Sequence, residues 1–337
     1  MFVKDSFLRV MAAHVRLTPS GHEFFVEGTH SILAAGVQAG LNLRFGCSSG
    51  NCGSCKARVV SGEVWKIRDH DYLLSERERQ MGYILTCSNT AVTDVVLEAA
   101  EALTPADIPV QEIRASVHRI DQLGSDRLLL HLQTPRTQTL RFMAGQWIHL
   151  TAENGASSHF PIASCPCDGR HIEFILRQDA ADAFTRLAFE GLSRGHTVTL
   201  QGPEGDFVLP PDIASPILFI ACGDGFAPIR SLVEHTLSTD IVEQLTLVWV
   251  VPQPGGHYLD NLCRTWADAF ENIHYRPLVL ENGKVDDLLG RLPAEWLSRP
   301  DVRIYIAGSP AWTLPLDERL RLDYPGCCLA VESRPEF

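Results

Sequence analysis

The sequence predicts a multidomain protein in which a small β-grasp domain, an antiparallel β-barrel and a doubly wound α/β domain follow one another. Three observations predict this order. Four cysteines with a distinctive spacing lie near the start, short alternating apolar stretches fill the middle, and strands alternate with helices in the last third. The length of 337 residues suits two or three domains. We expect domains at residues 12–101, 110–210 and 211–337, with a linker at 102–109.

The first segment has the pattern of strands packed around one helix. Residues 14–17 and 23–26 alternate like the two strands of a hairpin, and Ser31 can cap a helix over residues 32–37. Further strands and a charged helix complete the segment, at residues 57–60, 64–65, 75–81 and 94–98. Strands around a single helix in so short a segment indicate a β-grasp fold.

Four cysteines of this segment have the ligand spacing of a plant-type [2Fe–2S] cluster. Three form a C-x4-C-x2-C run and the fourth follows downstream. Glycines within the run let the backbone approach an inorganic core, and backbone N–H groups there can donate to the sulfurs. The alternative is a zinc site, which usually combines two C-x2-C pairs where this chain has one. The predicted ligands are Cys47, Cys52, Cys55 and Cys87.

Composition and charge narrow the remaining choices. Asp and Glu number 41 against 29 Lys and Arg, and the net charge of -12 argues against nucleic acid as a partner. No apolar run is long enough to cross a bilayer, and residues 1–13 lack a signal-peptide core, so we expect a cytoplasmic monomer. We expect the other six cysteines to be ordinary small apolar residues, since the pair Cys165 and Cys167 has no third ligand at a useful sequence spacing.

The last third of the chain has the pattern of a nucleotide-binding domain. A continuous apolar run at residues 216–221 predicts a buried parallel strand, which a glycine loop and a helix over residues 229–237 follow. Such a loop suits a dinucleotide because the backbone can approach the pyrophosphate at a helix N-terminus, although it can also be a simple strand–helix turn. Further strands are expected at residues 245–251, 273–275 and 302–306.

Short alternating stretches before this domain predict the barrel, at residues 113–117, 128–132, 147–150, 171–176 and 197–200. Five runs in these two segments carry a resemblance: GQW at 145–147, FPIAS at 160–164, GPEGDF at 202–207, GDGFAP at 223–228 and GSP at 308–310.

With the cysteine motif, these runs resemble the reductase components of multicomponent bacterial oxygenases. In that family a plant-type ferredoxin domain is fused to a ferredoxin–NADP reductase-like module. The resemblance covers nearly the whole chain after Met11 and implies a six-stranded barrel that binds FAD and an α/β domain that binds NAD(P)H. The implied cofactor-binding residues are Gln146, Trp147, Phe160, Pro161, Ile162, Ala163, Ser164, Arg177, Thr185, Gly202, Gly223, Asp224, Gly225, Pro228, Gly308, Ser309 and Pro310.

The chain departs from the family at several flavin contacts. Ser158 stands where relatives carry an arginine that pairs with the flavin phosphates, and Pro161 replaces a serine that hydrogen-bonds the flavin ring. Asp182 adds negative charge near the diphosphate, and Arg177 and Arg186 are the candidate compensating cations.

The nicotinamide side departs as well. Asp224 replaces a threonine between two glycines, and Ala307 replaces a cysteine. Phe337 is the one aromatic residue near the position of the usual C-terminal ring over the flavin. We expect altered cofactor contacts with retained activity.

The resemblance implies an NADH-dependent reductase that passes electrons from NADH through FAD and the cluster to a separate oxygenase. A flavin must intervene because NADH delivers a hydride and the cluster accepts single electrons. NADH is preferred over NADPH, since residues 250–258 hold no Arg or Lys for a 2′-phosphate. Two alternatives stay open: the iron–sulfur reductase of deoxysugar synthesis, and an electron carrier whose reductase half is only a docking scaffold.

Overall fold

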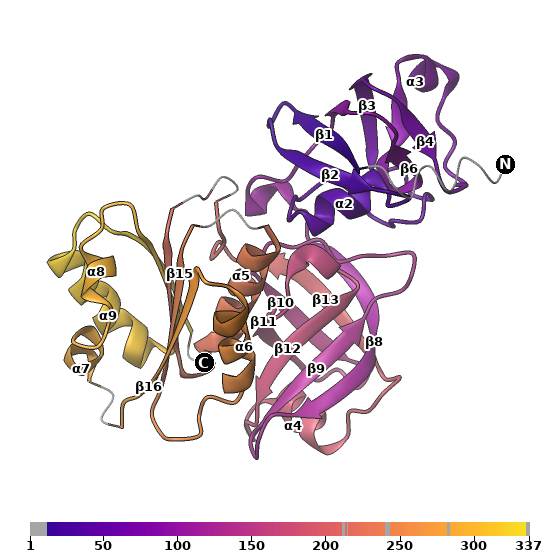
Figure 1. Ribbon diagram of the computed structural model, residues 1–337. Coiled ribbons are helices and arrows are strands. Elements are labelled where there is room, and N and C mark those ends of the chain that lie inside the picture. Colours follow the sequence, from indigo (N-terminus) through magenta and orange to yellow (C-terminus); the bar gives the residue numbers. More distant parts are fainter. Residues whose placement is uncertain (1–11, 211–212, 214, 240–242, 282–283, 335–337) are drawn as a thin grey trace.

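The computed structural model describes residues 12–210, 213, 215–239, 243–281 and 284–334, which form three domains in chain order (Figure 1). The N-terminal domain lies above the barrel, and the α/β domain packs against the side of the barrel. The predicted fold class is confirmed in all three parts. Among the described helices, none is both long and apolar enough to cross a bilayer.

The N-terminal domain contains β1 (Ala12–Thr18), β2 (Glu23–Glu27), α2 (Ile32–Gln38), β3 (Lys56–Ser61), β4 (Val64–Lys66), α3 (Glu76–Gln80), β5 (Tyr83–Leu85), η1 (Thr86–Ser88), β6 (Asn89–Ala91) and β7 (Val95–Glu98). Its main sheet has the order β2-β1-β7-β3-β5, with β1 and β7 parallel. Ser31 caps α2 by accepting a hydrogen bond from the Ala34 N–H at 3.1 Å. Helix α2 then buries Ile32 and Leu33 against the sheet.

The segment predicted as a linker is anchored along its length. It contains η2 (Pro105–Asp107), and the Asp107 carboxylate accepts hydrogen bonds from the N–H groups of Leu103 and Thr104. Ala102 and Ile108 are buried beside Met143 of the barrel domain. Packing at both ends therefore fixes this connection against the second domain.

The barrel domain is built from β8 (Gln111–Gln122), β9 (Arg127–Gln133), β10 (Trp147–Ala152), β11 (Ser157–Pro161), β12 (His171–Arg177) and β13 (Thr197–Glu204), with η3 (Pro166–Asp168) and α4 (Ala183–Glu190). The six strands are antiparallel in the order β11-β10-β13-β8-β9-β12. The N–H of Ala163 donates to the Glu173 carbonyl at 2.8 Å and brings the two ends of the sheet together. Alternate residues point inward, as in β8, where Ile113, Ala115 and Val117 are buried.

The α/β domain contains β14 (Ile217–Cys222), η4 (Gly223–Gly225), α5 (Phe226–Thr239), β15 (Leu245–Val251), α6 (Asp260–Ala269), β16 (Ile273–Val279), α7 (Val285–Leu289), α8 (Ala294–Leu297), β17 (Arg303–Gly308), α9 (Pro310–Asp323) and β18 (Cys328–Ser333). All five strands are parallel, in the order β16-β15-β14-β17-β18. Every residue of β14 and β15 is buried, because helices cover both faces of the sheet. The C-terminal ends of the central strands face the barrel domain.

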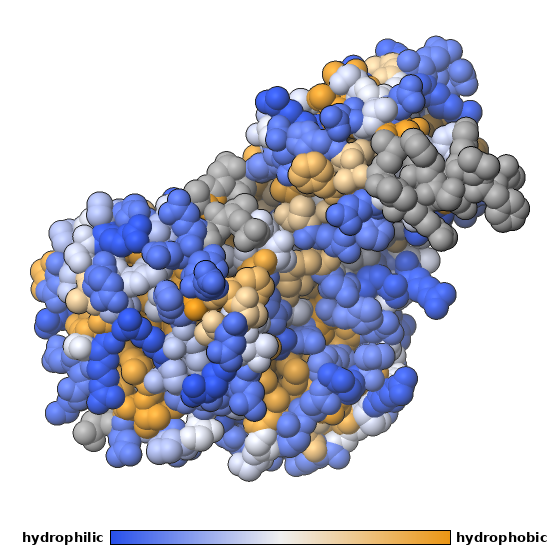
Figure 2. Space-filling model, viewed as in Figure 1, coloured by the Kyte–Doolittle hydropathy of each residue, from blue (hydrophilic) through white to orange (hydrophobic). Residues whose placement is uncertain are grey.

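The surface agrees with the acidic composition. Figure 2 shows a face that is mostly hydrophilic, with hydrophobic residues gathered where the N-terminal domain meets the rest of the molecule. This distribution fits a chain whose domains are held together by apolar packing at their junctions.

Candidate functional site

The four predicted ligand cysteines lie in the N-terminal domain, three between α2 and β3 and the fourth, Cys87, in η1. Cys47, Cys55 and Cys87 are buried, whereas Cys52 is exposed. The Sγ atoms of Cys55 and Cys87 lie 3.2 Å apart, although the two residues are 32 positions apart in the chain. Two of the four thiols are therefore in contact, as ligands of one cluster require, and the full set of four ligands stays a prediction.

Backbone donors surround these thiols. The N–H groups of Asn51 and Cys52 each donate to Cys47 Sγ at 3.3 Å, and the Ser54 N–H donates to Cys52 Sγ at 3.4 Å. Gly50 and Gly53 have φ of 91° and 71°, and these conformations turn the chain back around the sulfurs. Such N–H donors stabilise thiolates and raise the reduction potential of a cluster that they ligate.

The thiols have strongly shifted acidities. Burial raises the pKa of Cys47, but hydrogen bonds from Ser49 and Cys52 outweigh it and lower that pKa to about 6. The hydrogen bond from Cys55 lowers the pKa of Cys87 to about 7, and the same contact raises the pKa of Cys55. Four thiols, two of which accept backbone hydrogen bonds, are the donor set that a [2Fe–2S] cluster needs, so the loop fits this group.

The cysteine loop touches the barrel directly. The N–H of Thr139 donates to the Gly46 carbonyl at 3.2 Å, and the hydroxyls of Ser48 and Thr139 lie 3.3 Å apart. The Arg141 guanidinium lies 5.9 Å from the ring centroid of Phe45. The barrel therefore holds the loop that precedes the first ligand, at the end of the barrel where β12 begins.

A second site lies in the cleft between the barrel and the α/β domain. Its cavity has a volume of about 120 Å³ and is lined by six predicted cofactor residues: Trp147, Phe160, Pro161, Arg177, Thr185 and Asp224. Trp147, Phe160 and Ile175 form an apolar wall, as the ring of a flavin requires. Ser158, His159, Asp179, Asp182 and Ala227 complete the lining.

Asp224 closes this cleft by binding two arginines of the barrel. Arg127 Nε donates to Asp224 Oδ1 at 2.7 Å, and Arg177 Nη1 donates to Oδ2 at 3.2 Å. The Arg127 guanidinium also lies 5.0 Å from the ring centroid of the buried Tyr258. Burial opposes the charge on Arg127, but its contact with Asp224 raises the pKa of the guanidinium. The two guanidinium groups thus neutralise the charge of the Asp224 carboxylate.

The phosphate end of the cleft departs from the family pattern in the way the sequence indicates. Asp182 is the N-cap of α4, and its carboxylate accepts the Thr185 N–H at 2.6 Å. The two candidate compensating cations bind elsewhere, since Arg177 contacts Asp224 and Arg186 donates to the Ala180 carbonyl. The apolar wall and Arg177 fit a flavin, with phosphate contacts that differ from those of relatives.

The nicotinamide loop forms the turn between β14 and α5. A Cβ on Gly225 would lie 2.1 Å from the Ala307 carbonyl oxygen, so only glycine allows this loop to cross β17. The Gly223 carbonyl accepts a hydrogen bond from Trp249 Nε1 at 3.1 Å, and Trp249 stacks on Phe226. Pro228 lies in the buried first turn of α5, whose N-terminus points to the cleft.

The other predicted cofactor residues have structural contacts and lie outside the lining of the cavity. The Gln146 side chain accepts a hydrogen bond from the Met143 N–H and donates one to the Gly205 carbonyl. The Ser164 hydroxyl accepts a hydrogen bond from the Glu173 N–H. Ser309 caps α9. The rest are packed in the barrel or at the ends of strands: Ile162, Ala163, Gly202, Gly308 and Pro310.

Arg334 contributes a contact that the sequence did not indicate. Its guanidinium lies 4.1 Å from the ring centroid of Trp147, and its N–H donates to the Gly308 carbonyl. An arginine that follows β18 therefore covers the wall residue Trp147. Phe337, the aromatic residue considered for that role, lies outside the described residues.

Two further features were missed. No sequence motif surrounds Arg127. The one feature that could have identified it is its position opposite Arg177 in the pairing of β9 with β12. The expectation that Cys165 and Cys167 are ordinary apolar residues is wrong, because they form a disulfide.

A larger cavity of about 590 Å³ lies at the junction of the three domains, and no predicted cofactor residue lines it.

Two family models match the chain at these sites. The 2Fe-2S iron-sulfur cluster binding domain matches residues 15–92, which include all four predicted ligands. The oxidoreductase NAD-binding domain matches residues 219–313, which include the turn after β14.

Curated relatives agree with both matches. The CDP-6-deoxy-L-threo-D-glycero-4-hexulose-3-dehydrase reductase of Yersinia pestis is 32% identical over 80% of each chain. The reductase component 2 of terephthalate 1,2-dioxygenase from Comamonas sp is 26% identical over 83% of this chain and 84% of its own. The reductase component of propane 2-monooxygenase from Rhodococcus jostii is also 26% identical, over 88% and 84%.

Among solved structures, the ferredoxin reductase in carbazole 1,9a-dioxygenase covers 95% of this chain and 99% of its own, with a TM-score of 0.56 and 20% identity. That likeness supports the three-domain fold. With the cysteine cluster, the nucleotide turn and the extent of the sequence match, it leads to one conclusion: the chain belongs to the NAD(P)H-dependent, ferredoxin-reductase-type oxidoreductases that carry a [2Fe–2S] domain.

Proposed function

We propose that this protein is an NADH-dependent reductase that passes electrons from NADH through FAD to a [2Fe–2S] cluster and then to a separate protein. The observation that carries the proposal is the presence, in one chain, of a cysteine loop whose backbone N–H groups donate to Cys47 and an apolar cleft beside the turn after β14. A bound flavin supplies the chemistry that links a hydride donor to a one-electron acceptor.

The ligands that we propose for the cluster are Cys47, Cys52, Cys55 and Cys87. The close approach of Cys55 and Cys87 favours one iron for this pair and the second iron for Cys47 and Cys52. The exposed position of Cys52 favours electron exit at that side of the loop. The N–H groups of Asn51 and Cys52 then stabilise the negative charge on the Cys47 sulfur.

The cleft residues have separate tasks in this proposal. Trp147 and Phe160 shield the flavin ring from water, Arg177 meets phosphate charge, and Thr185 lies in the first turn of the helix beside it. Gly223 and Gly225 allow the pyrophosphate of NADH to approach the N-terminus of α5, where the helix dipole attracts anions. Arg127 and Tyr258 keep the Asp224 carboxylate aligned at this turn.

The electron acceptor is proposed to be an oxygenase component, as the names of the relatives from Comamonas and Rhodococcus describe. One observation favours a second candidate. The relative with 32% identity is named as the reductase of a CDP-deoxyhexulose dehydrase, so a sugar dehydrase is the alternative acceptor. NADH consumption that depends on one acceptor and its substrate, measured with purified proteins of each class, would separate these two.

The deciding experiment for the reductase itself is an anaerobic spectral titration of the purified protein. Both the cluster and the flavin bands should bleach on addition of NADH, with released flavin identified as FAD by chromatography. Cluster bands that neither NADH nor NADPH bleaches would overturn the proposal and favour an electron carrier with a degenerate reductase half.

A further inference from the structure

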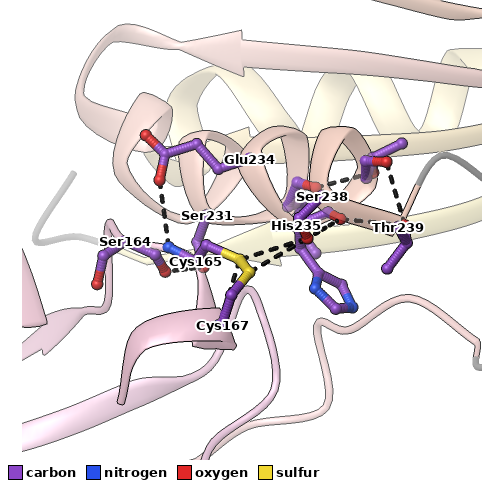
Figure 3. The surroundings of a disulfide bond; sticks show 10 residues. Ser164, Cys165, Cys167, Ser231, Glu234, His235, Ser238 and Thr239 are labelled. Carbon is purple, nitrogen blue, oxygen red and sulfur yellow. Dashed lines mark hydrogen bonds between the residues drawn. A yellow bond between two sulfur atoms is a disulfide. The ribbon is translucent and has the colours of Figure 1, made fainter. Parts of the chain in front are cut away.

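The disulfide between Cys165 and Cys167 lies beside a histidine in a position that suits metal ligation. The two cysteines flank Pro166 in the connection between β11 and β12, and their Cα atoms are 5.3 Å apart. His235 of α5 lies beside the two sulfurs (Figure 3). One ligand atom from each of the three residues lies within 4.8 Å of the others.

The histidine has a donor atom that its surroundings leave unused. Nδ1 of His235 is closed off from solvent and has no hydrogen-bond partner among the described residues. Buried polar atoms normally find a partner, so an unsatisfied imidazole nitrogen next to two sulfurs indicates a missing ligand. A neutral imidazole is the form of histidine that binds metals.

Backbone contacts fix the cysteine segment to α5. The Ser231 hydroxyl donates to the Ser164 carbonyl at 2.7 Å, and the Cys165 N–H donates to Glu234 Oε2 at 3.2 Å. Ser238 Oγ lies 3.1 Å from Cys167 Sγ (Figure 3). Contacts with α5 therefore fix the positions of the sulfurs and the imidazole relative to one another, as a preformed site requires.

This disulfide is expected to add little stability to the fold. A disulfide stabilises a chain mainly by closing a loop, and the effect grows with the length of that loop. Here a single residue separates the two cysteines, so the loop is close to the shortest that a disulfide can close. The pair is better suited to reversible chemistry than to restraint of the unfolded chain.

Reduction converts the pair into metal ligands. Two electrons and two protons, supplied by a dithiol reductant of the thioredoxin class, break the S–S bond and give two thiols. Zinc then displaces both thiol protons, and the two thiolates and the neutral imidazole fill three tetrahedral positions. Bonds of about 2.3 Å place two zinc-bound sulfurs about 3.7 Å apart, a distance that side-chain rotation can reach from fixed Cα atoms.

We propose that Cys165, Cys167 and His235 form a redox-dependent site for Zn²⁺, which binds the metal when the pair is reduced and loses it when the disulfide forms. The fourth position is left to water or to the Ser238 hydroxyl. The site joins the barrel to the α/β domain. It also lies against the N-terminal domain, because a Cβ on Gly40 would approach His235 Cε1 to 3.1 Å.

The test uses the full-length protein with its cluster. One sample is treated with a phosphine reductant and another with diamide; both receive zinc, and unbound metal is removed by gel filtration. Elemental analysis should find about one zinc per chain in the reduced sample and about a tenth of that in the oxidised sample. Iron measured in the same samples shows that the cluster is intact.

Matched variants make the result specific. Cys167→Ser and His235→Gln should each reduce the bound zinc at least about tenfold, whereas Cys327→Ser, which alters a half-buried cysteine outside the site, should retain it. Equal zinc in the reduced wild-type protein and in Cys167→Ser would overturn the proposal, as would zinc that persists after oxidation. Normal iron content in the variants distinguishes loss of the site from loss of the fold.

Discussion

Arg127 and Asp224 form an ion pair, with 2.7 Å between Nε and Oδ1, that ties the barrel to the nucleotide-binding turn. Asp224 lies in the turn after β14, and Arg177 binds its second oxygen. The side chains of Arg127 and Asp224 are only 18% and 12% exposed, so water screens this pair weakly. The cleft therefore combines a carboxylate in this turn with two guanidinium groups that compensate for its charge.

Arg177→Ala should weaken flavin binding. Arg177 is the arginine in the cavity lining, which also holds the carboxylates of Asp179, Asp182 and Asp224. Its loss leaves phosphate charge facing those carboxylates, and we expect the flavin Kd to rise at least about tenfold, or about 1.4 kcal/mol. Fluorescence titration of flavin-free protein with FAD measures this Kd. Arg186→Ala is the control, since Arg186 donates to the Ala180 carbonyl outside the cavity, and equal Kd values for both variants would contradict the assignment.

Cys52→Ser should interrupt electron transfer after the flavin. The replacement removes one proposed ligand at the exposed side of the cluster loop and leaves the cleft unchanged. Cytochrome c reduction, which needs the cluster, should fall at least about a hundredfold, while ferricyanide reduction from the flavin should change less than about twofold. Loss of both activities in a folded, flavin-loaded protein would refute the proposed order of electron flow. Cys328→Ser, at another exposed cysteine, should leave both activities unchanged.

Glu173 should make the junction between the barrel and α5 sensitive to acid. Burial raises its pKa, but His131 and Arg230 outweigh burial and lower the pKa to about 2. The ion pair with Arg230 is 2.6 Å long, and its side chains are 22% and 9% exposed. A carboxyl with a lowered pKa in the folded state stabilises the fold above its unfolded pKa, near 4.5, and this contribution is lost as the pH falls toward 2.

Glu173→Gln should therefore reduce the free energy of unfolding at pH 7 by about 1–3 kcal/mol. The difference from the wild-type protein should close between about pH 4.5 and pH 2. Urea denaturation followed by tryptophan fluorescence at several pH values measures both quantities. A difference that stays constant across this range would show that the titration of Glu173 does not couple to folding.

Local signals in the sequence predicted most of the fold. Ser31 caps α2 as predicted, because a hydroxyl that accepts a backbone N–H works within one turn, and α3 begins one residue after the predicted start, with Ser75 as its cap. The continuous apolar run before Gly223 is the central strand β14, since a parallel strand is covered on both faces. The parallel edge strand β18 was not predicted, because its residues are only half-buried and carry a weak pattern.

The site was less predictable where it depends on distant contacts. Arg127 and Asp224 are 97 positions apart, and no local pattern links them. The stacking of Arg334 on Trp147 likewise requires the last strand to be placed beside the barrel. The third ligand of the cysteine pair, His235, comes from another domain, so sequence spacing could not reveal it.

NADH should be preferred over NADPH. The segment after β15 carries no Lys or Arg, and the cation on the adjacent helix, Arg264, is bound to Asp260 at 2.7 Å. We expect kcat/KM for NADH to exceed that for NADPH at least about tenfold, because residues 250–258 offer no Lys or Arg to a 2′-phosphate. Gln253→Arg, at an exposed position of this segment, should narrow the ratio by raising kcat/KM for NADPH. A clear NADPH preference in the wild-type protein would show that the 2′-phosphate is bound by other residues.

Leu73 should contribute to the docking of a protein acceptor. Gly50 and Gly53 of the cluster loop pack against His70 and Tyr72, which places Leu73 beside the loop with 82% of its surface exposed. Burial of a leucine in an interface is worth about 1–2 kcal/mol, so Leu73→Ser should raise the KM for cytochrome c about five- to thirtyfold. Ferricyanide reduction, which needs no docking surface, should be unchanged. Leu322→Ser, at a leucine of α9 that is 72% exposed, is the control, and the same KM for both variants would place the docking surface elsewhere.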